Sequence, residues 1–361
     1  MRRRQSVAGS SADTHGSRGQ ETLRIVQFMA SQGYGGAEKV FIELSNALAA
    51  EHEVIALLLR GAIIGGRFSP QVRQVVLHSN PTSNNPFLHI ELYSRLKEIA
   101  PDLIHTHAAK GTTLVARVNR LLGFPHLGTK HNDRKGRIFN HLHWVSAVSE
   151  KSARSVLAAP GAEVRVIHNG VAVEDPGPVE KDGLFSIVAV GRLDAIKGFD
   201  VLIDQVAALP FAFRLHIVGE GPEKIRLEQQ IRNRGLSEKV VLEGFRDDIP
   251  RLMRRAHLVV ISSHQEGGPK VMIESLFYAD MLIATPVGAV PEVLPEKFQA
   301  RQEALAAKIA EVYSAYDRYR DEFAAIAAKR RSDFYLPEIV GKYRDFYRHI
   351  LETNGQSAGR S

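Results

Sequence analysis

Two glutamates on either side of a glycine-rich turn give the strongest chemical signal in the sequence. Glu266 directly precedes Gly267-Gly268-Pro269-Lys270-Val271, and Glu274 lies eight residues after Glu266. If a helix begins at this turn, the free backbone N–H groups between Gly268 and Val271 suit a phosphate group. We expect the two carboxylates to flank that phosphate, where each can accept hydrogen bonds from sugar hydroxyl groups.

A second candidate site contains two cations that follow a strand-like run. Arg192 and Lys197 lie within the segment Gly191–Gly198, directly after Ser186–Val190. Two cations at the end of a strand can bind the two phosphates of a diphosphate and neutralise charge that builds on a leaving group. The alternative is a pair of solvated surface cations.

A third glycine-rich segment follows the first strand-like run. Gly35 and Gly36 lie just before a helical pattern that starts at Ala37, where a backbone can approach an anionic ligand. Gly33 and Gly35 match the first two glycines of the dinucleotide-binding motif Gly-x-Gly-x-x-Gly, but Glu38 stands at the position of the third glycine. The segment therefore argues against a nicotinamide dehydrogenase, and a tight turn without a ligand stays possible.

Basic residues cluster in the first half of the chain. Residues 1–172 carry 21 Lys and Arg against 12 Asp and Glu, and the remainder carries 26 against 28. One short segment is basic, and Asp133 is its only acidic residue. Its basic residues are Lys130, His131, Arg134, Lys135 and Arg137. This pattern favours a polyanionic partner, a phosphorylated substrate or an anionic membrane face, with a solvated loop as the alternative.

Composition excludes several other classes of protein. The chain has 361 residues, of which 44% are hydrophobic and 24% charged, as in ordinary globular proteins. The absence of cysteine excludes disulfide scaffolds, thiolate metal sites and cysteine nucleophiles. No uncharged apolar run approaches the roughly 18 residues of a membrane-spanning helix, so we expect none.

The elements that must position these residues alternate between strand and helix. We expect a basic disordered tail over 1–20, a Rossmann-like N-terminal domain over 21–172, a linker over 173–183 and a Rossmann-like C-terminal domain over 184–333. Alternation of this kind predicts doubly wound parallel sheets, an α/β fold with the site in a cleft between the carboxyl ends of the two sheets.

The end of the chain has a helical pattern. Apolar residues from Leu305 to Ile326 recur every three or four positions, which predicts one long helix on its own domain or, alternatively, a coiled-coil dimer. A last helix over 334–352 has one apolar face and could return to the N-terminal domain, and we expect a tail over 353–361.

Taken in this order, the motifs resemble those of the retaining glycosyltransferases of family 4, which have the GT-B fold. Glu266 and Glu274 match the family's Glu-x7-Glu signature, and Arg192 and Lys197 match its basic pair. His107, in the run Leu103–His107, matches the histidine after its fourth strand. His105 and His107 stand two residues apart at this strand end, and we expect only His107 to face the cleft. The similarity extends from Leu23 to about Glu352.

The resemblance implies roles for these residues. Arg192 and Lys197 would take the diphosphate charge, Glu266 would hold the donor sugar, Glu274 would hold the ribose, and His107 would contact the sugar near the reacting carbon. Gly35, Gly36 and the turn from Gly268 to Val271 would complete the donor site.

The implied activity is transfer of a hexose or N-acetylhexosamine from a nucleotide diphosphate sugar, with a UDP-sugar expected, to a lipopolysaccharide, capsule or other lipid-linked glycan. No cofactor and no catalytic metal are expected, since no Asp-x-Asp motif occurs. The enzyme would be cytoplasmic, peripheral at the inner face of the plasma membrane, and would not bind nucleic acid. The alternatives are a GT-B phosphorylase or sugar-phosphate synthase, and a non-catalytic protein that binds polyanions.

Overall fold

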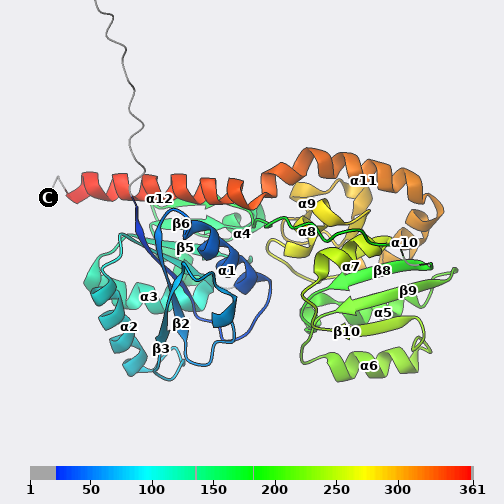
Figure 1. The fold of residues 1–361 in the computed structure, drawn as a ribbon, viewed down its shortest axis with the longest axis horizontal. Helices are drawn as coiled ribbons and strands as arrows, with labels where there is room; N and C mark the ends of the chain where they lie inside the picture. The colour runs from blue at the N-terminus through cyan, green and yellow to red at the C-terminus, as the bar shows by residue number, and fades with distance from the viewer. Residues whose placement is uncertain (1–21, 135, 182, 359–361) are drawn as a thin grey trace, which may run out of the picture.

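The chain folds into two parallel β-sheets that lie side by side and carry helices (Figure 1). The structure is a computed structural model, and it describes residues 22–134, 136–181 and 183–358. The tail predicted over 1–20 and the basic residue Lys135 lie outside these ranges. The two sheets confirm the predicted α/β class with two Rossmann-like units.

The N-terminal sheet has seven parallel strands in the order β3-β2-β1-β4-β5-β6-β7. Their bounds are β1 Arg24–Met29, β2 Glu53–Leu59, β3 Arg73–Leu77, β4 Leu103–His107, β5 His126–Lys130, β6 Trp144–Ala147 and β7 Glu163–Val166. The central strands are apolar on both faces because helices cover both; β2, for example, is buried over its last six residues.

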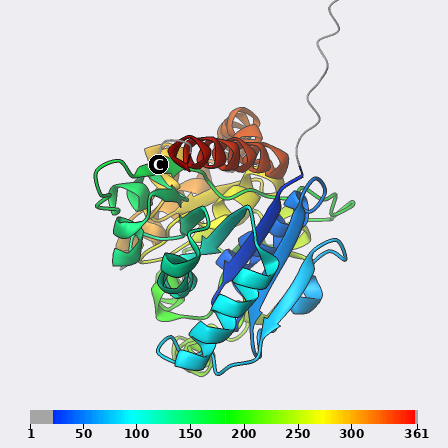
Figure 2. The same cartoon turned by 90° about the vertical axis from the view of Figure 1, so that its left-hand side faces the viewer.

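Helices on opposite faces close the N-terminal core. On one face lie α2 (Pro86–Ile99) and α3 (Ala108–Leu122), and on the other lie α1 (Gly36–Leu48) and the last helix, α12 (Leu336–Ala358). Figure 2 shows α12 along the top of this domain, opposite α2. The short helix α4 (Glu150–Arg154) follows β6, and its N-cap Ser149 accepts a hydrogen bond from the Ser152 N–H.

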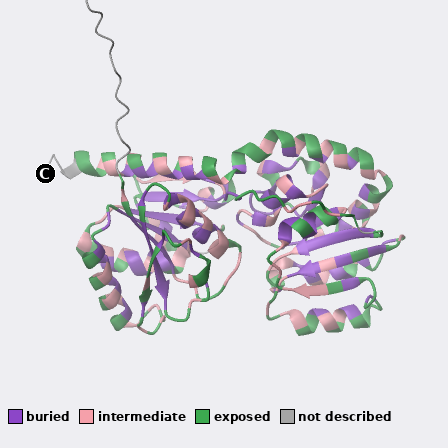
Figure 3. Ribbon diagram, viewed as in Figure 1, coloured by how far each residue is buried: buried purple, intermediate pink, exposed green. Residues whose placement is uncertain are grey.

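The C-terminal sheet has five parallel strands in the order β10-β9-β8-β11-β12. Their bounds are β8 Phe185–Val190, β9 Phe213–Val218, β10 Val240–Gly244, β11 Leu258–Ile261 and β12 Leu282–Ala284. The helices around it are α5 Phe199–Val206, α6 Lys224–Asn233, α7 Ile249–Arg255, α8 Lys270–Tyr278 and α9 Val290–Val293. Buried residues concentrate in the strands of both sheets, and the outer faces of helices such as α2 and α6 are exposed (Figure 3).

The single long helix predicted from Leu305 to Ile326 is two helices. A residue with non-helical backbone, Ala315, separates α10 (Leu305–Ser314) from α11 (Tyr316–Arg330). The apolar seam nevertheless belongs to the C-terminal core, because five of its side chains are buried there: Leu305, Ile309, Val312, Tyr319 and Phe323. The coiled-coil alternative is therefore wrong for this seam, whose apolar face is already covered.

The chain returns to the N-terminal domain through α12. Backbone hydrogen bonds join Val171 to Phe334 and Leu336, so the returning segment runs beside the outgoing one. The helix then buries Tyr343, Phe346 and Tyr347 against the N-terminal sheet. It runs to Ala358, so the tail predicted from residue 353 is helical over its first six residues. Within the described residues, every helix is too short or too polar to cross a lipid bilayer.

Strand order places the candidate residues at two equivalent points. The order reverses between β1 and β4 in the first sheet and between β8 and β11 in the second. Loops that leave adjacent strands in opposite directions open a crevice at the carboxyl edge of a parallel sheet, where ligands bind. The segments after β1, β4, β8 and β11 are those that the sequence motifs single out.

Candidate functional site

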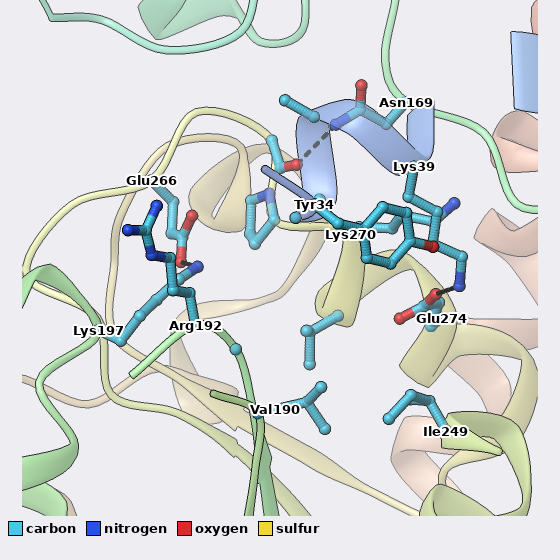
Figure 4. Close-up of a pocket in the computed structure, with 18 of the residues that line it drawn as sticks. Tyr34, Lys39, Asn169, Val190, Arg192, Lys197, Ile249, Glu266, Lys270 and Glu274 are labelled. Atoms are coloured by element: carbon cyan, nitrogen blue, oxygen red, sulfur yellow. Dashed lines mark hydrogen bonds and ion pairs between the residues drawn. The ribbon is translucent and has the colours of Figure 1, made fainter. Parts of the chain in front are cut away.

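A cavity of about 630 Å³ lies between the two domains. Its walls come from the loop after β1, the loop after β8 and the turn that opens α8, with further residues from the segment after β5. Figure 4 shows Arg192, Lys197 and Glu266 on one side of this pocket and Glu274 on the other. The volume is typical of a pocket for a small-molecule ligand or cofactor. The structure thus brings the three predicted donor-site segments together.

The glycine-rich turn is wedged between the domains. A β-carbon on Gly267 would collide with the carbonyl oxygen of His131, and one on Gly268 would lie 3.0 Å from the carbonyl oxygen of Val148. Only glycine therefore fits at Gly267 without moving the N-terminal backbone. From the segment after β7, Asn169 Nδ2 donates a hydrogen bond of 2.7 Å to the Gly268 carbonyl. Helix α8 begins directly after Pro269, so its N-terminal end borders the cavity.

The basic pair predicted after β8 lies beside the first glutamate. Lys197 Nζ is 2.5 Å from Glu266 Oε1, and Ser263 Oγ donates to the same oxygen at 2.7 Å. Arg192 is exposed and lines the cavity without an ion-pair partner among the described residues. A guanidinium and an ammonium beside an open pocket can receive a diphosphate. Their roles in catalysis stay predictions.

Close packing of two backbones supports this pair. The Gly191 N–H donates to the carbonyl of Val218, and the Leu193 N–H donates to that of Glu220, each at 2.9 Å. Gly219 adopts a φ of +143°, and a β-carbon there would collide with the Gly191 carbonyl. The loops after β8 and β9 are therefore locked together, which holds the residues between them in place.

The second glutamate belongs to a cluster of charges that joins the domains. Glu274 Oε1 lies 2.8 Å from Lys39 Nζ, and Lys270 Nζ lies 2.5 Å from Glu43 Oε2. Lys39 and Glu43 are on α1, and Lys270 and Glu274 are on α8. Burial alone would lower the pKa of Lys39, but the nearby acidic groups, Glu274 foremost and then Glu43, together raise it. We call these four residues the interdomain charge cluster. The sequence motifs identified Lys270 only through its backbone, and they missed Lys39 and Glu43.

An aromatic contact across the cleft was also missed. Tyr34 from the N-terminal domain and Phe245 from the C-terminal domain line the cavity, with ring centroids 6.0 Å apart at an edge-to-face angle. The guanidinium of Arg67 lies 4.1 Å from the Tyr34 ring centroid and 3.3 Å from Asp247. These contacts tie the two domains together at this part of the rim. Gly35 and Gly36 lie next to Tyr34, and both line the cavity.

His107 does not line the cavity, which corrects the expectation for this residue. It is 0% exposed at the end of β4, and its ring centroid lies 4.3 Å from that of His105. The expectation that only one of the two could face the cleft was wrong, because residues two apart in a strand point to the same face. Both rings are buried, with Tyr343 and Tyr347 of α12 packed against His105. The following residue, Ala108, has a left-handed φ of 60°.

His131 takes the position in the cavity wall that was expected for His107. His107 Nε2 lies 2.9 Å from Gln27 Oε1, which can only accept, so this nitrogen carries the hydrogen. Burial lowers the pKa of His107 well below its usual range, so its Nδ1 is an acceptor, and it lies 3.1 Å from His131 Nε2. His131 therefore donates from Nε2. Burial lowers its own pKa to about 4, so the ring is neutral at pH 7 and Nδ1 is left as an acceptor.

Tyr347 helps to hold the orientation on which this chain of hydrogen bonds depends. The Gln27 side-chain nitrogen donates to Tyr347 Oη at 3.3 Å, which turns the amide oxygen of Gln27 toward His107. His105 Nδ1 lies 2.7 Å from the same hydroxyl. The tautomer of His131 is thus set by residues on β1, β4 and α12. No local sequence pattern could have identified it.

The basic segment predicted as an acceptor or membrane face is only partly a surface. Lys130 is buried at 3% exposure, which corrects its assignment to that face, and His131 belongs to the cavity wall. Arg134 is exposed and lines the cavity, where its Nε donates to Gln265 Oε1 at 3.1 Å. Arg137 is exposed in a short 3₁₀ turn. Lys135 lies outside the described residues.

One polar atom near the turn has no partner. Asn169 is 6% exposed, its Oδ1 makes no hydrogen bond in the structure, and the residue lines the cavity. A buried oxygen without a partner costs free energy unless a ligand or water satisfies it.

The described residues contain no group of three or more histidine, aspartate and glutamate side chains placed to hold a metal ion.

Comparisons with known proteins agree with this architecture. The family model described as Glycosyltransferase Family 4 matches residues 34–175, and the model described as Glycosyl transferases group 1 matches residues 185–315. Together the two matches cover most of the chain.

Individual relatives show similarity over different lengths. The gpi3 subunit of phosphatidylinositol N-acetylglucosaminyltransferase from Schizosaccharomyces pombe is 33% identical over 165 residues, which are 43% of this chain and 36% of that protein. The match to the corresponding human protein covers 45% of its length, so the chain spans less than half of either relative. An α-1,4-N-acetyl-D-galactosaminyltransferase of Campylobacter jejuni, whose name specifies a diphospho-undecaprenol-linked substrate, is 24% identical over 88% of this chain and 96% of its own.

Solved structures show the same fold. Anabaena HepE, crystallised with UDP-glucose, superimposes with a TM-score of 0.78 at 21% identity, over 92% of this chain and 100% of that chain. The paired sheets, the interdomain cavity and the two family matches lead to one conclusion. The chain belongs to the family 4 glycosyltransferases and has the GT-B fold.

Proposed function

We propose that the protein is a retaining glycosyltransferase that moves a hexose or N-acetylhexosamine from a UDP-sugar to a glycan or lipid-linked acceptor, such as a lipopolysaccharide or capsule precursor. The observation that carries this proposal is the meeting of Arg192, Lys197 and Glu266 with the α8 turn in one interdomain cavity. The names of the Campylobacter and Anabaena proteins, which mention a lipid-linked acceptor and UDP-glucose, support the choice of acceptor and donor classes.

In the proposed reaction, the bond between the anomeric carbon and the β-phosphate oxygen breaks while the acceptor oxygen bonds to the same face of that carbon. The acceptor proton passes to the departing phosphate oxygen. Arg192 and Lys197 neutralise the charge that develops on this phosphate, since preorganised cations act most strongly where charge appears in the transition state. The N-terminal end of α8 adds partial positive charge.

The carboxylates and the histidine would orient the substrates. Glu266, held by Lys197 and Ser263, would accept hydrogen bonds from the donor sugar, and Glu274 would accept them from the ribose. Glu274 reaches Lys39 in the structure, so a bound ribose would share this carboxylate with Lys39 or displace it. We assign the contact with the sugar near the reacting carbon to His131 Nδ1, with Gln27 and His107 as positioning residues.

Binding of a donor offers the first test. A panel of UDP-, GDP-, ADP- and CMP-sugars is added and the melting temperature is recorded, because a ligand that binds only the folded state raises it. We expect a UDP-sugar to give the largest rise. If no nucleotide sugar changes the melting temperature while an oligonucleotide does, the non-catalytic alternative is favoured and the proposal fails.

Turnover is the second test. The donor that binds is incubated with lipid-linked glycans and, in parallel, with inorganic phosphate and sugar phosphates, and the anomeric configuration of the product is read by NMR. We expect transfer to a glycan with retention of configuration. Transfer only to phosphate or a sugar phosphate would instead establish the phosphorylase or synthase alternative. A lipid-linked acceptor would place the enzyme at the cytoplasmic face of the membrane.

A further inference from the structure

Two further cavities on the N-terminal domain adjoin the interdomain cavity. The first, of about 500 Å³, shares His131, Asn132 and Arg134 with the interdomain cavity. The second, of about 570 Å³, shares Lys130 and Arg134 with the first and extends to Arg137. The three cavities therefore adjoin one another, from the proposed donor site across the N-terminal domain. We call the part lined by Lys130, Arg134 and Arg137 the basic channel.

The basic channel has an excess of positive charge. Among the described residues that line its two cavities, Asp133 is the single carboxylate. Asp133 is already occupied, because its side chain is 3.1 Å from Lys151 Nζ and also accepts a hydrogen bond from Gln265. Three cations with their nearest carboxylate already paired create a local potential that attracts anions.

Lys130 is the most informative of these cations. Its side chain is almost completely buried, yet its ammonium has no carboxylate within 4.0 Å among the described residues. Its contacts are the Ser155 carbonyl, at 3.4 Å, and the ring of Phe139, whose centroid is 5.7 Å away. Burial lowers the pKa of Lys130, and the attraction of the Asp133 carboxylate, which raises it, offsets only part of this effect. Such burial is costly, and an anion in the adjoining cavity would offset that cost.

Arg134 connects the channel to the donor site. It lines all three cavities, and its Nε is held by Gln265, the residue next to Glu266. A guanidinium in this place can reach an anion on the acceptor side while the donor occupies the interdomain cavity. Apolar surface lies beside the cations, from Ala108, Ala109 and Phe139, and Leu157 is 76% exposed at the outer end. The channel thus combines cations with room for a carbon skeleton.

We propose that the basic channel binds a phosphate or diphosphate group carried by the acceptor, close to the hydroxyl that receives the sugar. The inference rests on the proposed function, because it takes the interdomain cavity as the donor site. Phosphate is favoured over a neutral glycan because Asp133, the single carboxylate among the described residues that line the channel, is already paired with Lys151. The same chemistry could come from the acceptor itself or from the headgroup of a surrounding phospholipid, and the two sources are distinguished below.

The test is a calorimetric titration of the UDP-saturated protein with inorganic diphosphate at low ionic strength. UDP fills the donor site, so added diphosphate reports a second site. Lys130→Met keeps the alkyl chain and removes the charge, and Arg137→Gln removes a second charge from the outer cavity. The matched control is Arg120→Gln, which removes an exposed cation on α3 that lines none of the three cavities.

We expect the parent to bind one diphosphate beside UDP, and Lys130→Met to weaken this binding at least about tenfold, the usual effect of losing one charge-assisted contact. Arg137→Gln should weaken it less, and Arg120→Gln should not change it. UDP affinity should be unchanged in all three variants. No variant should lower the melting temperature, and Lys130→Met should raise it, because it removes a buried ammonium that has no carboxylate within 4.0 Å among the described residues. No diphosphate binding by the UDP-saturated parent, or equal weakening in the Arg120→Gln control, would overturn the inference. Failure of UDP itself to bind would instead reject the proposed donor site.

Flotation with vesicles separates the two sources. Parent and Lys130→Met proteins are mixed with phosphatidylglycerol vesicles and, as a control, with phosphatidylcholine vesicles. If the channel serves a phosphate of the acceptor, both proteins bind phosphatidylglycerol equally, although Lys130→Met binds diphosphate more weakly than the parent. If binding to phosphatidylglycerol falls in parallel with diphosphate binding, the channel serves phospholipid headgroups and the assignment to the acceptor is overturned.

Discussion

The two walls of the cleft hold their polar residues in different ways. In the C-terminal wall, Arg192, Lys197 and Glu266 come from two loops, and close backbone packing within the domain shapes the loop that carries the cations. In the N-terminal wall, His131 is oriented through His107 and Gln27, whose amide is in turn held by Tyr347, more than 300 residues away in the sequence. Loop-built sites can be recognised from local motifs. A buried network needs the assembled fold, since its members share no local pattern.

The largest effect should come from the cations of the C-terminal wall. Replacing Arg192 or Lys197 with alanine should lower kcat/KM for transfer by roughly 100-fold or more, comparable to the loss of one transition-state donor. Neither side chain is part of the apolar core, so circular dichroism and the melting temperature should stay close to those of the parent. Near-normal transfer by both variants would contradict the assignment of this wall to the diphosphate.

The corresponding test of the N-terminal wall separates contact from positioning. His131→Ala should lower kcat/KM by about 100-fold, comparable to the loss of one preorganised polar contact beside the reacting carbon. Gln27→Met should cost less, about tenfold, because it only releases the tautomer of His107 and thus of His131. The exposed His143 provides the control as His143→Ala.

The pH profile checks that Gln27 acts through the histidines. In the parent, the pKa of about 4 at His131 should keep transfer constant down to about pH 5. With Gln27→Met, the pH below which transfer falls should change. His107 Nε2 then loses the acceptor oxygen that fixes its hydrogen, and the protonation of His107 and His131 is no longer coupled to that oxygen. An unchanged profile with a simple loss of stability would show that Gln27 is only structural.

The two glutamates should differ in nucleotide binding. Glu274→Ala should weaken binding of UDP by about 1–3 kcal/mol, the cost of losing a hydrogen bond to a charged group. Glu266→Ala should leave UDP binding nearly unchanged and lower transfer strongly, because this residue faces the sugar. Calorimetric titration with UDP decides between them. If both variants bind UDP as the parent does, the ribose role of Glu274 is wrong.

A smaller effect concerns stability and again falls on the N-terminal domain. Burial lowers the pKa of His126 to about 3. The unfolded chain therefore takes up a proton at about pH 6.5 that the folded chain refuses, and the free energy of unfolding should fall as the pH drops from 6.5 toward 3. At pH 5 this histidine alone should cost about 2 kcal/mol. Urea unfolding at pH 7.5 and 5 should show a smaller difference for His126→Gln than for the parent.

The smallest effect expected is that of a chelator. Because Arg192 and Lys197 are placed to neutralise the diphosphate, we predict that EDTA leaves the rate of transfer unchanged. The assay compares the rate with excess EDTA against the rate after addition of Mg²⁺ or Mn²⁺. A rate that collapses with EDTA and returns with one of these ions would show that the cations of the C-terminal wall are not sufficient.

The alternation of strands and helices was predictable because it depends on local periodicity. Buried parallel strands need continuous apolar runs, such as Val54–Leu59, and the covering helices need one apolar face. The break at Ala315 was not predictable in the same way, since the apolar seam keeps its spacing on both sides of it and neither glycine nor proline stands there. The return of α12 to the N-terminal domain was proposed from its apolar face. Which surface the helix covers is decided by the β-bridge between Val171 and Tyr335, where the returning segment pairs with the outgoing one.

For the site, the sequence by itself determined the residues of the C-terminal wall, because glycines, cations and carboxylates at short fixed spacings act through the backbone that carries them. It also pointed to the end of β4, but His107 is buried there against Phe41, His105 and His131 and does not line the cavity. Only the tertiary structure decided that Lys39 meets Glu274, that Lys130 is buried, and that Arg134 lines three adjoining cavities. Such contacts form between segments that are distant in the chain, and only the packing of the two domains brings them within reach.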